Sequence, residues 1–276
     1  MAARKNATAT GAGVLRPEEF ARHVRLDRSD CAVDLAPWVE NYWSLRWQLP
    51  EGASYLSSTL PHPACTLSVE RGHRREGTGP EAVVVTGVIA HRFDVTVRDE
   101  GWVFGVKFRP GGLASLAGVN ARELRDVTVS ASEIFDAATV AELDELGPQH
   151  STDECRVRAD IVLGRLATSP DDDYRLLLDV VTTMLEDRSL VRVAQVEERC
   201  GIGTRALQRL FQRYVGVSPK WVLARYRIHD AVTDLDAGYA GTLADLAARY
   251  GWFDQAHFTR EFTDLVGVPP GEYQRA

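Results

Sequence analysis

The chain has 276 residues, of which 45% are hydrophobic and 26% charged, proportions that are ordinary for a soluble globular protein. Its length exceeds what one small core usually organises, so we expect two domains. The formal net charge of −7 argues against a protein that coats nucleic acid through overall positive charge. No apolar run approaches the roughly 20 residues of a membrane-spanning helix, and the first residues lack the apolar core of a secretory signal, so we expect a cytoplasmic protein with no membrane partner.

The cysteines carry little information about function. Cys31, Cys65, Cys155 and Cys200 are scattered, and no pair has the C-x-x-C spacing. This pattern argues against a disulfide framework and against a structural zinc site. We therefore expect buried or idle thiols and no bound metal or cofactor.

The amino-terminal half begins with a polar tail and continues with strands. Residues 1–13 are small and polar, which predicts a disordered tail. Strand-like runs rich in aromatic or alternating apolar residues follow, separated by proline and glycine, at residues 41–49, 65–70, 83–86 and 102–108. Short strands at this spacing predict a small sandwich or barrel.

The character becomes helical between residues 113 and 166, and a break follows. The segment Thr168-Ser-Pro-Asp-Asp-Asp173 combines a proline with clustered acids, which oppose helix continuation. We therefore place an amino-terminal domain at residues 14–168, a linker at 169–173 and a second, all-helical domain at 174–276.

The last third contains an internal repeat of about 50 residues. Both copies contain Arg-x-Phe, then four residues, then Gly-Val-x-Pro, at residues 209–219 and again at 260–270. By itself, such a repeat could also indicate a helical solenoid. Further matching segments precede these elements, at residues 193–201 and 243–251.

Each copy has the parts of a helix-turn-helix unit. Gly201 or Gly251 supplies the backbone freedom of a tight turn, and Thr242 with Asp245 forms a predicted capping box. Apolar residues of each second helix are expected to be buried, which leaves its polar face outward. The first copy lies in a basic stretch, since residues 192–227 hold eight basic and two acidic residues.

The outward polar residues suit the reading of base edges. Arginine presents two parallel donors to guanine, and glutamine can pair with adenine. The alternative is that arginine and glutamine are common on solvated helices, and the repeat favours DNA contact over that alternative. The predicted DNA-binding residues are Thr204, Arg205, Gln208, Arg209 and Arg213 in the first copy, and Gln255, Ala256, Thr259 and Arg260 in the second.

The connection between the copies supports the same interpretation. Residues 219–235 predict one helix of about 16 residues, hence about 24 Å long. Such a rod could hold two reading helices roughly one duplex turn apart, about 34 Å, so that one chain enters successive major grooves.

Over residues 171–276 the sequence resembles the AraC family of bacterial transcription regulators. The second copy carries the most specific match, Gly251-Trp-Phe-Asp-Gln-Ala-His-Phe-Thr-Arg-Glu-Phe262. Two positions depart from the family pattern: Gly203 replaces a capping Ser, so that Thr204 is the remaining candidate cap, and Ala256 replaces a position that is often polar. Residues 104–112 are similar to a segment in a subgroup whose sensory domain is poorly characterised.

The resemblance implies double-stranded DNA as partner and an amino-terminal sensory or dimerisation domain, often a cupin-like barrel. The expected fold class is thus α+β, with a cupin-like barrel or sandwich and flanking helices before an all-α bipartite helix-turn-helix domain. A small-molecule effector, RNA polymerase and a second copy of the chain are the further partners that we consider.

The aromatic residues of the amino-terminal half could line an effector cavity, because sites for small organic molecules are rich in aromatic side chains. They could equally form core or dimer contacts. Lys107 and Arg109 could neutralise an anionic effector, although such residues more often lie in solvent. The candidate effector residues are Trp38, Tyr42, Trp43, Trp47 and Trp102.

A rival hypothesis is a metal-dependent or ligand-binding cupin-type protein whose carboxy-terminal helices only dimerise. The chain has no His-x-His to begin a metal triad, and His62 with Cys65 does not complete a site. It also lacks Gly-x-Ser-x-Gly, a phosphate loop and His-Glu-x-x-His. We therefore predict a regulator with no catalytic residues.

Overall fold

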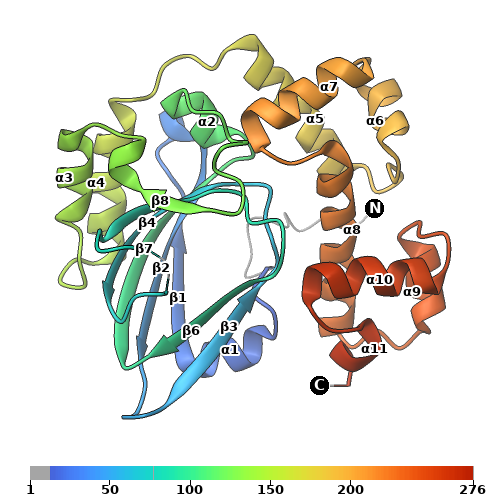
Figure 1. Ribbon diagram of the computed structural model, residues 1–276, viewed down its shortest axis with the longest axis horizontal. Coiled ribbons are helices and arrows are strands. Elements are labelled where there is room, and N and C mark those ends of the chain that lie inside the picture. Colours follow the sequence, from blue (N-terminus) through green and yellow to red (C-terminus); the bar gives the residue numbers. More distant parts are fainter. Residues whose placement is uncertain (1–12, 77, 276) are drawn as a thin grey trace.

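The computed structural model describes residues 13–76 and 78–275. The predicted disordered tail, apart from Gly13, falls outside these residues. Figure 1 shows a β-rich amino-terminal part beside a helical carboxy-terminal part, with α8 between them.

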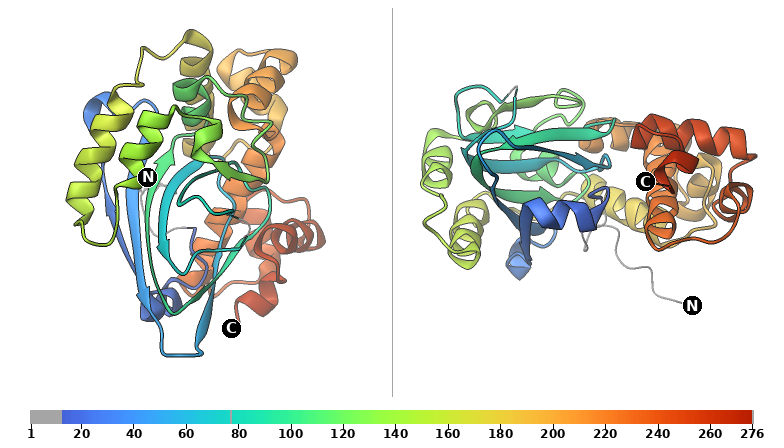
Figure 2. Two further views of the ribbon diagram at one scale, coloured as in Figure 1. Left: turned by 60° about the vertical axis from the view of Figure 1, so that its left-hand side comes forward. Right: turned by 90° about the horizontal axis from the view of Figure 1, so that it is seen from below.

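The amino-terminal part is built on two antiparallel sheets. The larger has the strand order β1-β2-β7-β4-β5-β8, and the smaller pairs β3 with β6. The two sheets form an open sandwich (Figure 2). The strands are β1 (Val24–Ser29), β2 (Val39–Gln48), β3 (Ser54–Thr59), β4 (Thr66–Gly72), β5 (Val83–Thr86), β6 (Phe93–Arg98), β7 (Glu100–Phe108) and β8 (Thr128–Ser130).

Side-chain alternation gives the larger sheet two different faces. On β7, the even-numbered residues from Trp102 to Phe108 belong to the main hydrophobic core. The odd-numbered residues face the smaller sheet, and among them Gly105 lies beneath an indole ring. A Cβ added at Gly105 would be 2.1 Å from the ring of Trp43, so this glycine lets a tryptophan of β2 lie across β7.

Helices cover the outer face of the larger sheet. α4 packs against β1 and β2, and the hydroxyl of Tyr42 on β2 donates to Asp160 of α4 at 2.8 Å. The stretch 113–166 was expected to be helical throughout, but it also contains β8 and a loop. The helices of the amino-terminal part are α1 (Pro17–His23), α2 (Gly112–Ala117), α3 (Ala137–Asp144) and α4 (Thr152–Gly164), with short 3-10 turns at Val33–Leu35 and Ala131–Glu133. Among them, α1 packs at the inner face, against Trp47 and Val103.

The helical part starts immediately after the acidic break in the sequence. Asp171 caps α5, because its carboxylate accepts a hydrogen bond from the backbone N–H of Tyr174 at 2.7 Å. The helices that follow are α5 (Asp172–Glu186), α6 (Val193–Cys200), α7 (Thr204–Leu210) with a π-helical extension η3 (Phe211–Val215), α8 (Pro219–Asp236), α9 (Leu243–Arg249), α10 (Gln255–Val266) and α11 (Pro270–Tyr273).

The two helix-turn-helix units are attached to the sandwich differently. Buried residues of α5, α6, α7 and the first turns of α8 share one continuous core with the larger sheet. The loop after α2 contacts η3, where the backbone N–H of Ala121 donates to the carbonyl of Arg213 at 3.0 Å. The second unit has a core of its own, to which the amino-terminal part contributes Leu15 and Leu60.

Candidate DNA interface and effector cavity

A cavity of about 270 Å³ lies between the two sheets. Strand register shows that its two ends differ in polarity. At one end Trp47 on β2 lies opposite Val24 on β1, and Phe20 of α1 closes that end. At the other end Lys107 on β7 lies between Asn41 of β2 and Thr66 of β4.

Lys107 organises the polar end of the cavity. Its ammonium lies 3.1 Å from the carboxylate of Glu40 and 3.0 Å from Nε2 of His62. Burial lowers the pKa of Lys107 to about 8, although Glu40 opposes this shift. Burial also lowers the pKa of His62 well below its usual value, with Lys107 and Arg225 adding repulsion, so His62 is the neutral acceptor of this contact.

Arg225 brings α8 to this end of the cavity. Its side chain is 1% exposed, and Nε donates to the carbonyl of Pro61, a residue of the cavity wall. Both Nη1 and Nη2 are buried and have no hydrogen-bond partner among residues 13–76 and 78–275. The pKa of Arg225 is lowered to about 10, mainly by burial. A residue of the helical part is therefore held directly behind the cavity wall.

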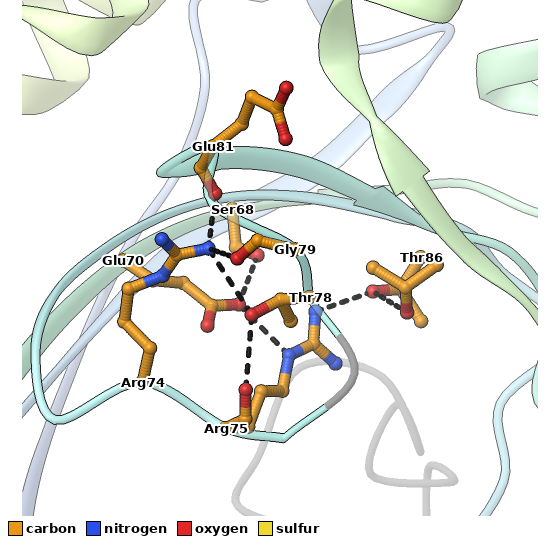
Figure 3. Close-up of polar contacts among 9 residues, drawn as sticks. Ser68, Glu70, Arg74, Arg75, Thr78, Gly79, Glu81 and Thr86 are labelled. Carbon is orange, nitrogen blue, oxygen red and sulfur yellow. Dashed lines mark hydrogen bonds and ion pairs between the residues drawn. The ribbon is translucent and has the colours of Figure 1, made fainter.

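A second polar cluster forms the β4–β5 side of the cavity (Figure 3). Arg75 reaches inward from the loop after β4 and donates to Glu70 at 3.0 Å and to Thr86 at 2.7 Å, while Ser68 donates to Glu70 at 2.9 Å. The neighbouring Arg74 does not line the cavity and holds the same loop through backbone carbonyl groups, including that of Gly79 at 2.9 Å (Figure 3). The charges of Arg75 and Glu70 thus compensate each other at this side of the cavity.

The first helix-turn-helix unit presents the polar face of α7 to solvent. Leu207 and Leu210 are buried, whereas Arg205, Gln208 and Arg209 are exposed. In the described part of the chain, neither of these two arginines forms an ion pair. The helix has Gly203 as its N-cap residue and no side-chain cap, so Thr204 does not substitute for the missing serine.

Arg213 lies in a different environment from the other arginines of this unit. It lies on the π-helical extension, 3.8 Å from the carboxylate of Asp173, and its guanidinium stacks on the ring of Tyr214 with 4.8 Å to the centroid. Tyr214 in turn donates to the α5 cap Asp171 at 2.8 Å. Arg213 is exposed, but contacts with α5 and η3 hold it in place.

The second unit presents α10 in the same manner. Asp254 caps this helix by accepting from the backbone N–H of His257 at 2.7 Å, and Phe258 and Phe262 are buried beneath it. The predicted capping box of Thr242 and Asp245 is present at the start of α9. The outer face of α10 forms a shallow groove that is lined by Gln255, Ala256, Thr259, Arg260, Thr263 and Asp264.

α8 separates the two units, and each packs at one of its ends (Figure 1). Ser218 caps α8, accepting from the backbone N–H of Trp221 at 3.2 Å. The helix has 18 residues and is therefore about 27 Å long.

Comparison with protein families divides the chain in the same way. Residues 196–276 match a family described as "Helix-turn-helix domain", and residues 29–130 match a "Domain of unknown function (DUF6597)". A putative AraC-like transcription regulator of Streptomyces lividans is 31% identical over 83 residues, which cover 30% of this chain and 27% of that protein. The carboxy-terminal part of the chain is an AraC-type helix-turn-helix domain.

Other relatives are more distant from the chain. An uncharacterized HTH-type transcriptional regulator of Haemophilus influenzae is 24% identical over 104 residues, covering 38% of this chain and 35% of that protein. The chain thus spans about a third of the length of the curated relatives it matches. Among solved structures, ToxT of Vibrio cholerae superimposes with a TM-score of 0.42 and 11% identity, covering 92% of this chain and 98% of ToxT.

The structure separates the candidate effector residues into two groups. Trp43 and Trp47 line the cavity beside the AraC-type domain. Trp38, Tyr42 and Trp102 lie in the hydrophobic core instead, so the prediction that they line a cavity was wrong for these three. Strand parity explains two of them, because Tyr42 on β2 and Trp102 on β7 occupy even positions, whose side chains point away from the smaller sheet. Trp38 precedes β2 and is buried in the same core.

Sequence reasoning missed several residues of the cavity. His62 was considered only as a metal ligand with Cys65, and Glu70, Arg75 and Arg28 were not considered. Alternation along β2 and β4 carried a signal for Glu70, since Thr66, Ser68 and Glu70 occupy one face of β4. Lys107 lines the cavity, whereas Arg109 donates to the carbonyl of Ala36 at 2.5 Å outside it.

The described residues contain neither a metal-ligand cluster nor a membrane-spanning helix. Among residues 13–76 and 78–275, no group of three or more His, Cys, Asp or Glu side chains is arranged to hold a metal ion. Burial raises the pKa of the Cys65 thiol to about 12. In the same ranges, no helix combines the length and apolar character needed to cross a membrane.

Proposed function

We propose that the chain is a sequence-specific DNA-binding transcription regulator whose activity depends on a small molecule bound between the two sheets. The observation that carries this proposal is the pair of exposed polar faces on α7 and α10, one at each end of α8. Each is the second helix of a helix-turn-helix unit, which is the helix that enters the major groove in such units.

The dimensions of the AraC-type domain support binding to one face of a duplex. α8 is about 27 Å long, and helices that read successive major grooves lie about 34 Å apart. Basic side chains on both units would contact phosphates and fix the register, while the outermost side chains would read bases. The proposed DNA-binding residues are Thr204, Arg205, Gln208, Arg209, Arg213, Gln255, Ala256, Thr259 and Arg260.

The position of the cavity supports control by an effector. The indole N–H of Trp221 on α8 donates to the carbonyl of Ala90 at 3.2 Å, and Ala90 follows the cavity residue Ile89. Arg92 in the same segment donates to the carbonyl of Val266 at the end of α10 at 3.0 Å. A ligand that moved residues 89–93 would therefore act on both α8 and α10.

On this proposal the chain is not an enzyme and acts in the cytoplasm. Residues 14–168 form the sensory part, residues 169–173 the linker and residues 174–276 the DNA-binding part. A second copy of the chain and RNA polymerase are the protein partners that a regulator of this kind would use.

The test is enrichment of duplexes from a random pool on the full-length protein, followed by titration of the recovered site. We expect a bipartite site whose log affinity falls linearly with log salt concentration. The double variant Arg209→Ala, Arg260→Ala should lose the site, whereas the control Arg25→Ala, on β1, should bind normally. Absence of any enriched sequence, even at low salt, would refute the proposal.

A further inference from the structure

The cavity between the sheets has the chemistry of a site for an organic acid. We propose that it binds a monocarboxylic acid of about ten non-hydrogen atoms, with its carboxylate at Lys107 and His62 and its apolar body directed toward Trp47 and α1. The inference rests on the proposed function, because it names the class of effector. It can be tested without DNA.

The polarity of the wall changes in one direction along three neighbouring strands. On β2 the inward residues run from Trp47 through Leu45 and Trp43 to Asn41. On β1 they run from Val24 through Leu26 to Arg28, and on β7 from Val103 to Lys107. On β4 the inward residues Thr66, Ser68 and Glu70 are polar throughout, but Glu70, which lies opposite Val103, is paired with Arg75. The gradient along β1, β2 and β7 therefore favours a ligand with one polar and one apolar end, placed with its polar end at Lys107.

The charge of the wall favours an anion at the polar end. Arg75 is paired with Glu70, so these two charges cancel. Lys107 contacts Glu40, but an ammonium has three donors and only two of them have protein partners. Arg28 at the rim lines the same end and forms no ion pair within the described residues, which leaves the polar end with excess positive charge.

One buried donor at the polar end lacks an acceptor among the described residues. Because Nε2 of His62 accepts from Lys107, its proton lies on Nδ1, which is buried and has no partner within residues 13–76 and 78–275. Arg225 lies behind the cavity wall and does not line it, but its charge adds to the positive potential at His62 and Lys107. A buried donor without an acceptor is unfavourable, and a carboxylate accepts several hydrogen bonds at once.

The volume limits the size of the acid. About 270 Å³ accommodates roughly nine or ten non-hydrogen atoms if each takes about the 30 Å³ that a water molecule occupies in the liquid. The two indole rings of Trp43 and Trp47 favour a flat or flexible apolar body over a branched polar one. Octanoate and the slightly larger 3-phenylpropanoate are both close to this size.

The experiment is calorimetric titration of the full-length protein with octanoate, 3-phenylpropanoate, octan-1-ol and octylamine. Octanoate and octan-1-ol share the same apolar body, so their comparison isolates the carboxylate. We expect at least one of the two acids to bind at least tenfold more tightly than octan-1-ol, and octylamine not to bind. Equal or tighter binding of the alcohol or the amine would overturn the proposal, as would failure of both acids to bind.

Two variants at the polar end should change acid affinity in opposite directions. Lys107→Met should weaken acid binding at least tenfold, and Glu40→Gln should tighten it, because the amide no longer competes for the ammonium. The matched control Lys220→Met changes an exposed lysine of α8 and should have no effect. If Lys107→Met fails to fold, the Glu40→Gln result decides, since unchanged or weaker binding in that variant contradicts the proposal.

These measurements separate the acid site from the regulatory function. Acid binding is measured without DNA, and enrichment of duplexes is measured both without acid and at saturating acid. A protein that selects a DNA site but binds neither acid would refute the inference alone. A protein that binds acid but selects no DNA sequence would refute the proposed function and leave the site in place.

Discussion

Arg209 and Arg213 are four positions apart, but their surroundings predict different roles on DNA. Arg209 is exposed on α7 without an ion pair in the described part of the chain, whereas Arg213 is held beside Asp173 and Tyr214. A free guanidinium at the outer face of a reading helix can approach a guanine edge. One that is fixed near the helix end is better placed for a phosphate.

We therefore expect Arg209→Ala to cost about 1–3 kcal/mol and to relax preference at one base pair. Arg213→Ala should weaken all sequences alike and reduce the salt slope by about one. Titration of each variant against single-base-pair changes of the selected site distinguishes the two effects. Equal losses on every sequence for Arg209→Ala would assign that residue to the phosphates instead.

Individual residues were predictable from the sequence only where a pattern fixed their direction. The repeat fixed which side of α7 and α10 faces outward, and Leu207 and Phe258 are buried as that pattern required. The aromatic set had no such constraint, and Tyr42 and Trp43 point to opposite faces of β2. The importance of His62 depends on Lys107 and Arg225, which are distant in sequence and meet only in the folded chain.

Among the elements, β7 is packed closely against an indole ring of β2 at Gly105. An added Cβ at Gly105 would be 2.1 Å from the ring of Trp43, whereas nothing lies within 4 Å of an added Cβ at Gly164 in α4. Overpacking of this kind costs about 1–3 kcal/mol. Alanine at an unhindered helical position instead stabilises by about 0.5–1 kcal/mol.

We expect Gly105→Ala to lower the free energy of unfolding by about 1–3 kcal/mol and to weaken acid binding, because the indole must move into the cavity. Gly164→Ala should leave the protein unchanged or slightly more stable. Urea denaturation of both variants measures the difference. A Gly105→Ala variant as stable as the parent would show that Trp43 is not fixed across β7.

The elements themselves were partly predictable. Four strand-like runs correspond to β2, β4, β5 and β7, because each contains several large apolar residues. β1, β3, β6 and β8 were missed. Val24–Ser29 and Phe93–Arg98 alternate with charged or polar residues, Ser54–Thr59 is mostly polar, and Thr128–Ser130 is short. The insertion of β7 between β2 and β4 joins segments that are far apart in sequence, and no local pattern specifies that pairing.

At the scale of the whole molecule, the two helix-turn-helix units differ in their freedom to move. The first shares the core of the sandwich, whereas the second has a separate core and a few polar contacts with residues 89–93. A second unit attached in this way can change its position relative to the first without loss of the main core. Its contacts with the cavity wall are then the physical basis for coupling between ligand and DNA.

Arg92 is the residue that tests this coupling. Nη2 of Arg92 lies 2.7 Å from a carboxylate oxygen of Asp94, and Nη1 donates to the carbonyl of Val266 at the end of α10. Its neighbour Phe93 lines the cavity. Arg92→Ala removes the link but no residue that we place against acid or DNA.

The Arg92→Ala variant should therefore still bind the acid and still bind DNA. The coupling free energy, by which bound acid changes the affinity for DNA, should fall to near zero. In the parent protein we expect a coupling free energy of about 1–3 kcal/mol. Thermodynamic linkage requires that bound DNA change the acid affinity by the same amount as bound acid changes the DNA affinity. The control Arg98→Ala changes an exposed arginine at the far end of β6, the strand that follows Arg92, and should retain the full effect. Full coupling in Arg92→Ala would mean that the signal reaches the second unit through α8, where Trp221 and Arg225 contact the cavity wall.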